Sequence, residues 1–195
     1  MKIIGIGGLP RSGKDSLAEL IIKSGYYGVS LGDIVRNQSH VRHVEEPDPI
    51  SVANMTETAN WLRREKGSDF ALSEALGQFQ AAGGEQKYKG LLLYSVRAPV
   101  EVDFILKNGG QLIWLAANDK VRYQRAMNNR RQGEAKIEFD EFKRQENLQW
   151  QPQPGMAPEA QMNIEYVKSK STISLENSDN DIEKFKQSAQ KTLGL

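Results

Sequence analysis

The chain has 195 residues, with 38% hydrophobic and 26% charged side chains, which is enough for one domain with a full core. It has no cysteine, which excludes disulfides, thiolate metal sites and thiol catalysis, and its net charge of +1 gives no overall field favouring nucleic acid. No apolar run approaches the roughly 20 residues of a membrane span, and the first residues are unlike a signal peptide, so we expect a cytoplasmic protein without a membrane partner.

Apolar runs alternate with amphipathic stretches along the chain, which predicts strands alternating with helices. Strands are expected over 2–7, 25–31, 90–96, 111–116 and 171–175. Helices are expected over 12–24, 32–38, 56–66, 69–82, 99–107, 118–131, 139–148 and 181–193. This order predicts a three-layer α/β fold, in which helices cover both faces of a five-stranded parallel sheet.

Two stretches interrupt this alternation within what we expect to be a single domain over 1–195. Residues 38–84 form an all-helical insertion between the second and third strands, and 130–161 form a second excursion. Both should lie over the carboxyl ends of the strands, where parallel sheets bind their ligands. We expect the first to act as a flap that binds an acceptor and the second as a lid.

A phosphate-binding loop is predicted directly after the first strand, in the segment Gly8-Leu9-Pro10-Arg11-Ser12-Gly13-Lys14-Asp15-Ser16. Its glycines let backbone N–H groups turn inward around phosphate oxygens, and Lys14 would reach the β- and γ-phosphates. A glycine-rich turn can match this spacing by chance, but the strand before it and the helix after it favour a P-loop. We therefore expect ATP, held by Gly8, Arg11, Ser12, Gly13, Lys14, Asp15 and Ser16.

The residue after the lysine departs from the usual pattern. Asp15 stands where a serine or threonine hydroxyl normally ligates Mg²⁺, and Ser16 comes one step later. A carboxylate is a good oxygen ligand for Mg²⁺, so Asp15 could hold the ion directly or through water, but it could equally repel the phosphates. We predict a Mg²⁺ site at Asp15 and Ser16, and the sequence leaves these alternatives open.

The segment Ser30-Leu31-Gly32-Asp33-Ile34-Val35-Arg36 resembles the nucleoside monophosphate kinase group of P-loop proteins. In adenylate kinases a strand end, a Ser/Thr-Gly-Asp sequence and an arginine three residues on open the monophosphate-binding helices. The resemblance implies that Arg36 clamps the acceptor phosphate, for which a guanidinium fork is suited. Asp33 is the best-placed candidate for a general base. The alternative is an ordinary helix start with an exposed arginine.

A second resemblance lies in Tyr94-Ser95-Val96-Arg97-Ala98-Pro99-Val100-Glu101-Val102. It is similar to an Asp-Gly-Ile-Arg-Ser-Pro-Ala-Glu-Val segment of archaeal and bacterial proteins related to dephospho-coenzyme A kinase or adenylate kinase. This resemblance implies that Arg97 contacts the acceptor phosphate. The acidic residue of that segment is missing here, unless Asp15 or Asp33 substitutes for it. Alternatively, Arg97 is a helix-capping or buried structural arginine.

Further residues come from the same resemblance. Arg63 matches an arginine in a recurring Ala-Asn-x-Leu-Arg pattern and is a candidate for substrate contact. Arg122, Arg125 and Arg130 correspond to arginines of the lid and its helix; we expect Arg122 to contact the cofactor and Arg125 and Arg130, with Lys14, to act in catalysis. Asn177 corresponds to a turn that lies near adenine. Any of these arginines could instead be a solvated surface residue.

Together these features predict ATP-dependent transfer of a phosphoryl group to a small nucleotide-like acceptor, most simply a nucleoside or deoxynucleoside monophosphate. One alternative is an enzyme like dephospho-coenzyme A kinase. Another is a nucleotide-binding regulator or weak ATPase, which Asp15 and the missing acid favour. A nucleic-acid-associated ATPase is disfavoured by the near-zero net charge. The sequence gives no indication of oligomeric state.

Overall fold

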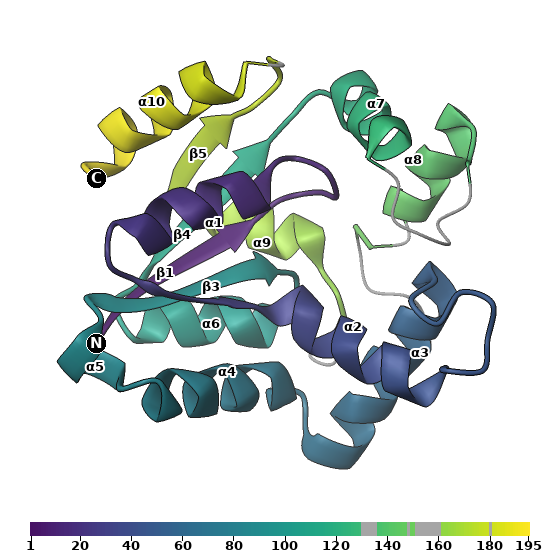
Figure 1. Cartoon of the computed structure of the whole chain (residues 1–195), viewed down its shortest axis with the longest axis horizontal. Helices are drawn as coiled ribbons and strands as arrows, with labels where there is room; N and C mark the ends of the chain where they lie inside the picture. The colour runs from purple at the N-terminus through teal and green to yellow at the C-terminus, as the bar shows by residue number, and fades with distance from the viewer. Residues whose placement is uncertain (130–135, 148, 151–160, 180) are drawn as a thin grey trace.

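The computed structural model describes residues 1–129, 136–147, 149–150, 161–179 and 181–195. A five-stranded parallel sheet runs through its centre in the order β2-β3-β1-β4-β5 (Figure 1). The strands are β1 (Lys2–Gly7), β2 (Tyr27–Ser30), β3 (Gly90–Val96), β4 (Gln111–Ala116) and β5 (Ile173–Glu176). The N-terminal strand therefore lies in the middle of the sheet, and the loop that follows it emerges at the centre of the ligand-binding edge.

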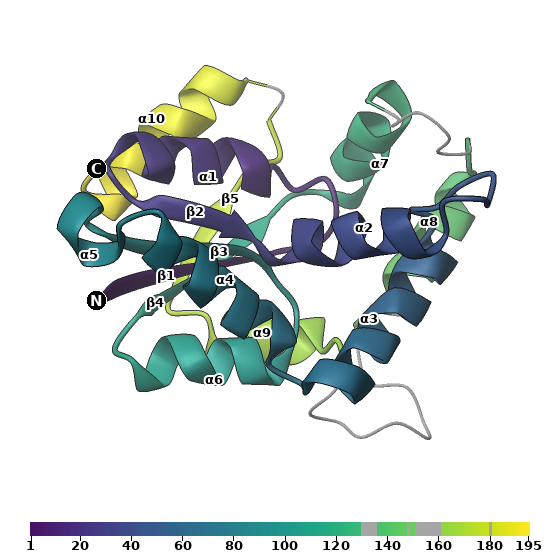
Figure 2. The ribbon, with the colours of Figure 1, turned by 60° about the horizontal axis from the view of Figure 1, so that its bottom comes forward.

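Helices cover both faces of the sheet, so the predicted three-layer α/β fold is confirmed (Figures 1 and 2). On one face, α1 (Lys14–Lys23) and α10 (Ile182–Leu193) bury Leu17 and Phe185 against Ile6 of β1. On the other face, α4 (Phe70–Ala81), α6 (Pro99–Lys107) and α9 (Ile164–Lys170) pack against Ile3, Leu91 and their neighbours. Side chains of a parallel strand buried on both faces are apolar throughout, which explains the continuous apolar runs.

The chain between β2 and β3 is helical, as predicted. It contains α2 (Leu31–Arg42), α3 (Val52–Lys66), α4 and the short α5 (Gly84–Lys87), which the sequence analysis missed. Ser30 begins α2 by accepting a hydrogen bond from the backbone N–H of Asp33 at 3.1 Å. This cap fixes the start of α2 at the end of β2, so the side chains of its first turn lie at the edge of the sheet.

The second excursion begins after α7 (Asp119–Asn128), and α8 (Phe139–Asn147) packs beside α7 through contacts of Tyr123 with Phe139 and Phe142. Arg130 and residues 130–135, 148, 151–160 and 180 lie outside the described residues. The sequence analysis missed α9, whose two buried apolar residues, Ile164 and Val167, are too few for a helical pattern. In the described part of the chain, no helix has both the length and the apolar character needed to cross a bilayer.

Candidate active site

A large cavity of about 910 Å³ opens at the carboxyl ends of β1, β2 and β3. It is bounded by the loop after β1, by α2, α3 and α4, and by the end of β3. The predicted site residues in its lining are Arg11, Gly13, Lys14, Asp15, Ser16, Asp33, Arg36, Arg63, Arg97 and Arg125. Residues predicted from separate motifs thus come together around one cavity.

The loop after β1 is held in shape by close backbone approaches. Gly8 has φ +153°, and a Cβ atom on it would lie 2.5 Å from the carbonyl oxygen of Leu115. Gly13 has φ +99°, and a Cβ atom there would lie 2.3 Å from Nδ2 of Asn177. Both positions therefore require glycine, and the first helix starts at Lys14 rather than at residue 12 because Gly13 is in the left-handed region.

Lys14 is only 8% exposed, and its Nζ donates to the carbonyl oxygens of Gly8 at 3.0 Å and Leu9 at 2.8 Å. Burial, together with the nearby charges of Arg97 and Arg122, lowers the pKa of Lys14 from its usual 10.5 to about 7, while the charge of Asp15 opposes this fall. The lysine thus sits where positive charge is costly unless an anion is bound. This is the electrostatic environment expected of a phosphate site.

Asn177 and Arg125 support the loop from the β5 side. Asn177 is 3% exposed and donates from Nδ2 to the Ser12 carbonyl at 2.8 Å. Arg125 donates to Oδ1 of Asn177 at 3.3 Å and to the carbonyl of Asp179 at 2.8 Å. Asn177, predicted to bind the cofactor, lies beneath the loop rather than in the lining of the large cavity, and its contact with ATP stays a prediction.

Arg122 lies outside the large cavity as well. It is 2% exposed, donates from Nε to the Ala117 carbonyl at 2.9 Å and forms a buried ion pair with Glu146 of α8. Its Nη1 also reaches the Pro10 carbonyl at 3.5 Å. These contacts tie α7 and α8 to the loop, while the predicted contact of Arg122 with a nucleotide stays a prediction.

The start of α2 contributes a charged pair to the cavity. Arg36 forms an ion pair with Asp33, one helical turn before it. Tyr94 lines the cavity at the end of β3, at the position of the acidic residue in the segment that this part of the sequence resembles. Burial raises the pKa of the Tyr94 hydroxyl, Asp15 raises it further and Arg36 lowers it. Tyr94 therefore lies within the electrostatic reach of both the loop and α2.

The sequence analysis missed Glu101, which positions Arg97. Glu101 is 8% exposed, and its Oε2 accepts the backbone N–H groups of Arg97 at 2.7 Å and Ala98 at 3.0 Å. Burial raises the pKa of the Glu101 carboxyl, while these hydrogen bonds and the charge of Arg63 oppose the rise. A glutamate three residues after the N-cap position, here Ala98, is a capping signal that could have identified it.

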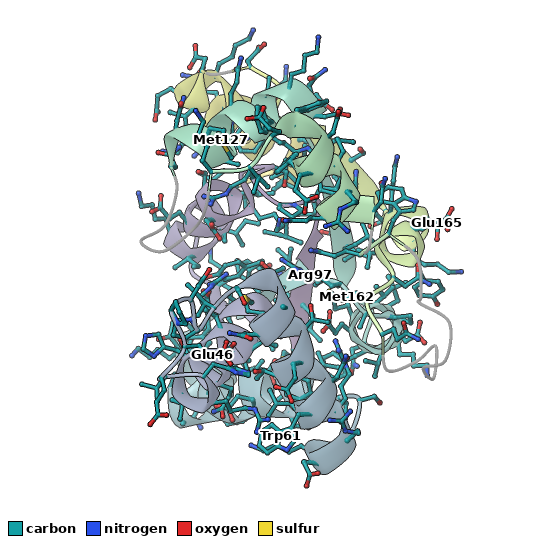
Figure 3. All side chains as sticks on the ribbon, turned by 90° about the vertical axis from the view of Figure 1, so that its right-hand side faces the viewer. Glu46, Trp61, Arg97, Met127, Met162 and Glu165 are labelled. Atoms are coloured by element: carbon teal, nitrogen blue, oxygen red, sulfur yellow. The ribbon has the colours of Figure 1, made fainter. Side chains whose placement is uncertain are left out.

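Gln149 is a second residue that the sequence analysis missed. The Nη1 of Arg97 donates to Oε1 of Gln149 at 3.1 Å. It also lies 3.9 Å from Sδ of Met162, and Figure 3 labels Arg97 and Met162. Gln149 and Met162 both line the large cavity. Gln149 follows α8 in a stretch without a motif, so only the three-dimensional structure brings it to the site.

Asp15 and Ser16 present a carboxylate and a hydroxyl in the first turn of α1, beside Lys14 and in the lining of the cavity. These oxygen ligands suit Mg²⁺ when phosphate oxygens complete its shell. Within the described residues, no group of three or more histidine, cysteine, aspartate or glutamate side chains could hold a metal ion without a ligand.

Comparison with known proteins places this architecture in a family. A family model described as AAA domain matches residues 4–149, which include the whole of the loop after β1, the helices α2 to α4 and α8. The chain belongs to this AAA domain family. Curated relatives include a UPF0200 protein of Pyrobaculum aerophilum, 30% identical over 144 residues, 73% of this chain and 74% of that protein. Another is a UPF0200 protein of Methanococcus maripaludis, 26% identical over 69% of this chain and 71% of the other.

Solved structures of similar fold include several kinases. Shikimate kinase from Bacteroides thetaiotaomicron has a TM-score of 0.57 and 14% identity, with 99% of this chain and 98% of the other covered. Dephospho-CoA kinase from Campylobacter jejuni has a TM-score of 0.51 and 15% identity, with 99% and 96% covered. These likenesses confirm the P-loop kinase-like fold that the sequence predicts.

Proposed function

We propose that this protein is an ATP-dependent kinase that transfers the γ-phosphoryl group to a small phosphate-bearing acceptor, a nucleoside or deoxynucleoside monophosphate. One observation supports this most strongly. Arg36, Arg63 and Arg97 come from three different elements and line the same cavity as Lys14 of the loop. Several guanidinium groups facing one space suit an acceptor that carries a phosphate, because each can donate two parallel hydrogen bonds to phosphate oxygens.

The donor side uses the loop and the start of α1. Backbone N–H groups and Lys14 would hold the triphosphate, with Arg11 and Arg125 near its β- and γ-phosphates. Asp15 and Ser16 would hold Mg²⁺, which when bound neutralises charge on the β- and γ-phosphates. Arg125, and Arg130 from the proposed lid, would stabilise the charge that spreads over the transferring group.

The acceptor side uses the proposed flap and the end of β3. Arg36 and Arg97 would fix the acceptor phosphate so that one of its oxygens attacks the γ-phosphorus as the bond to the β,γ-bridging oxygen breaks. A phosphate oxygen is already ionised at neutral pH, since its second pKa is about 6. Such an acceptor needs no general base, and Asp33 would then orient Arg36; for a hydroxyl acceptor, Asp33 would be the candidate base.

Two alternative functions can be tested together with this proposal. An enzyme acting on dephospho-coenzyme A is one, because a solved structure of similar fold is a dephospho-CoA kinase. A nucleotide-binding regulator or weak ATPase is the other, favoured by Tyr94 standing where similar proteins carry an acid. The missing carboxylate would weaken the metal shell, unless Asp15 supplies it.

The test is a thermal-shift and phosphoryl-transfer panel of nucleoside and deoxynucleoside monophosphates, dephospho-coenzyme A, shikimate and gluconate, each with ATP and Mg²⁺. A ligand that binds only the folded state raises the melting temperature. A monophosphate should bind and accept phosphate. Turnover of dephospho-coenzyme A alone would favour the first alternative, and ATP binding without transfer to any acceptor would favour the second.

Substitutions of Arg97 and Arg36 then test where the acceptor binds. Arg97→Ala and Arg36→Ala should each weaken binding of the monophosphate that the panel identifies by roughly tenfold or more, with ATP binding retained. Arg64→Ala is the matched control, because Arg64 is an exposed neighbour of Arg63 outside the cavity lining. Normal acceptor binding by the Arg36 and Arg97 variants, or loss of ATP instead, would contradict the assignment.

A further inference from the structure

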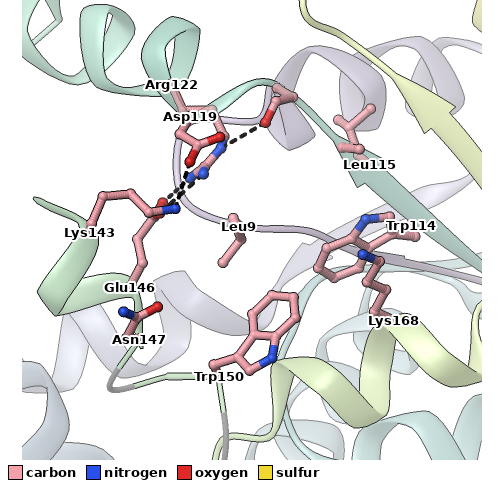
Figure 4. A pocket seen from close by; sticks show the side chains of 12 residues that line it. Leu9, Trp114, Leu115, Asp119, Arg122, Lys143, Glu146, Asn147, Trp150 and Lys168 are labelled. Atoms are coloured by element: carbon pink, nitrogen blue, oxygen red, sulfur yellow. Dashed lines mark hydrogen bonds and ion pairs between the residues drawn. The ribbon is translucent and has the colours of Figure 1, made fainter.

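A second cavity lies on the other side of the loop, enclosed by the end of β4, by α7, α8 and α9 and by Leu9 of the loop itself (Figure 4). Its volume is about 330 Å³, which is within the range of small-molecule sites. It shares no lining residue with the large cavity. Of its lining residues, only Arg122 is also predicted to contact the nucleotide, so the proposed reaction leaves the rest of this cavity unused.

One end of this cavity is aromatic and carries a positive charge. Trp114 and Trp150 meet edge to face, with ring centroids 6.5 Å apart. The ammonium of Lys168 lies 5.9 Å from the Trp114 ring and 5.8 Å from the Trp150 ring (Figure 4). In the described part of the chain, the exposed side chain of Lys168 forms no ion pair with a carboxylate, and its ammonium lies beside the two indole rings.

At the other end of the cavity, each cation forms an ion pair with a carboxylate. Arg122 pairs with Glu146, and Lys143 pairs with Asp119 at 2.8 Å and lies 3.6 Å from Glu146. Three cations and two carboxylates therefore line the cavity, a balance of +1 that resides at Lys168. A cationic ligand would be repelled there, whereas an anion would gain a charge-assisted contact.

We propose that this cavity binds a small planar aromatic anion, such as an aromatic carboxylate of one or two rings. The ring of the ligand packs against Trp114, Trp150 and Leu9, and its anionic group is held by Lys168. Aromatic rings favour edge-to-face and offset contacts with indole, and these add to the burial of apolar surface. No bond forms or breaks in this site.

The cavity also contacts the nucleotide loop. Leu9 belongs to the loop, and Arg122 in the cavity wall reaches the carbonyl of Pro10 at 3.5 Å. A ligand that packs on Leu9 thus touches the same segment that would bind ATP, so the two ligands should alter each other's affinity by the same factor. This coupling rests on the proposed function, whereas binding of the aromatic anion does not.

The experiment uses 2-naphthoate as the probe, titrated into the full chain by calorimetry and by saturation-transfer NMR. We expect saturable binding to one site, roughly tenfold weaker in Lys168→Gln, because that change removes the charge and keeps a polar, unbranched side chain. Lys170→Gln is the matched control: Lys170 is on the same helix, with its ammonium 5.5 Å from the Tyr166 ring and outside the cavity. It should bind the probe as the unaltered protein does.

Two further ligands test the chemistry. The neutral 2-naphthalenemethanol should bind more weakly than 2-naphthoate, and cyclohexanecarboxylate should bind more weakly because it lacks a planar ring. Trp150→Leu, checked for folding by its melting temperature, should also lose the probe. Equal binding by the Lys168 and Lys170 variants, equal binding of the neutral analogue, or no saturable binding would overturn the proposal. If the probe binds but leaves ATP affinity unchanged, the proposed coupling is wrong and the proposed binding site stands.

Discussion

The guanidinium of Arg97 is joined to the amide oxygen of Gln149 by a 3.1 Å hydrogen bond across 52 positions of sequence. Around this contact, the backbone N–H of Asn163 donates to the Arg97 carbonyl at 2.8 Å, and that of Ile164 donates to the Gln149 carbonyl at 3.3 Å. Side chain and main chain together therefore attach the segment after α8 to the end of β3. The orientation of Arg97 depends on a part of the chain that shares no motif with it.

Gln149→Glu should weaken binding of the acceptor more than binding of ATP. The new carboxylate would pair with Arg97 and repel an acceptor phosphate, so we expect the acceptor KM to rise about tenfold or more while the ATP dissociation constant is kept. Steady-state kinetics with the acceptor varied would measure this. Gln145→Glu is the control, with the same charge change on α8 at a side chain bonded to Glu141; an equal rise in KM there would remove Gln149 from the site.

ATP binding should be coupled to protonation of Lys14. With a pKa of about 7 in the empty protein, roughly nine in ten lysines are neutral at pH 8, and a bound triphosphate restores the charge. We expect uptake of nearly one proton per ATP at pH 8, falling toward zero below pH 6. Calorimetry in buffers of different ionisation enthalpy measures it. Lys14→Arg keeps its charge at all these pH values and should show no uptake; an uptake as large in that variant would exclude Lys14 as its source.

Asp15→Asn should raise the Mg²⁺ concentration needed for half-maximal activity, because an amide is a weaker ligand for a hard cation than a carboxylate. Glu19→Gln is the control: it removes the same charge one turn later on α1, also at the edge of the cavity. If both variants need the same Mg²⁺ as the unaltered protein, or if Asp15→Ser works better at unchanged metal demand, then Asp15 is no ligand.

Gly13→Ala should destabilise the loop by more than the free-energy cost of placing an L-residue in this backbone conformation. An L-residue in the left-handed region costs about 1–2 kcal/mol, and the added Cβ would also meet Nδ2 of Asn177 at 2.3 Å. Gly109→Ala isolates the first effect, because Gly109 has φ +69° and no atom within 4 Å of an added Cβ. Chemical denaturation and ATP titration should therefore show the larger loss at Gly13. Equal stability losses with ATP affinity intact would argue against a rigid loop.

Breaking the buried pair of Arg122 and Glu146 should be costly. Glu146→Leu leaves a buried guanidinium without its counter-charge, and we expect a loss of about 3–5 kcal/mol in unfolding free energy. Adding Arg122→Met should recover most of it, because two apolar side chains can replace a buried pair. Asp179→Ala removes an exposed pair with Lys184 and should cost at most about 1 kcal/mol. No recovery in the double variant would indicate a role beyond charge compensation.

Much of the fold is predictable from sequence because buried parallel strands are continuously apolar. The predicted ranges 90–96, 99–107 and 111–116 coincide with β3, α6 and β4. The ends of other elements are less predictable where a cap decides them, as at Gly13 and at Ser30, whose side chain starts a helix that extends to Arg42.

The residues of the candidate site also differ in how well the sequence predicts them. Local motifs predict Lys14 of the loop and the arginines Arg36, Arg63 and Arg97. The side chains of these residues line one cavity. Glu101 contacts Arg97 from four residues away and has the position of a helix-capping residue, so its role could have been predicted. Gln149 contacts Arg97 across 52 positions, so its type and place in the sequence give little indication of a role. Their roles, like those of the predicted site residues, await the experiments above.

The two hydrogen bonds from Lys14 to the carbonyls of Gly8 and Leu9 have a consequence for how the proposed nucleotide would enter and leave. These bonds hold the loop in a formed shape, so in the proposed reaction entry of a phosphate would be an exchange of partners for Lys14 rather than the folding of an unformed loop. The same carbonyls would receive Lys14 again when the product departs, and this exchange would keep the loop in shape between one turnover and the next.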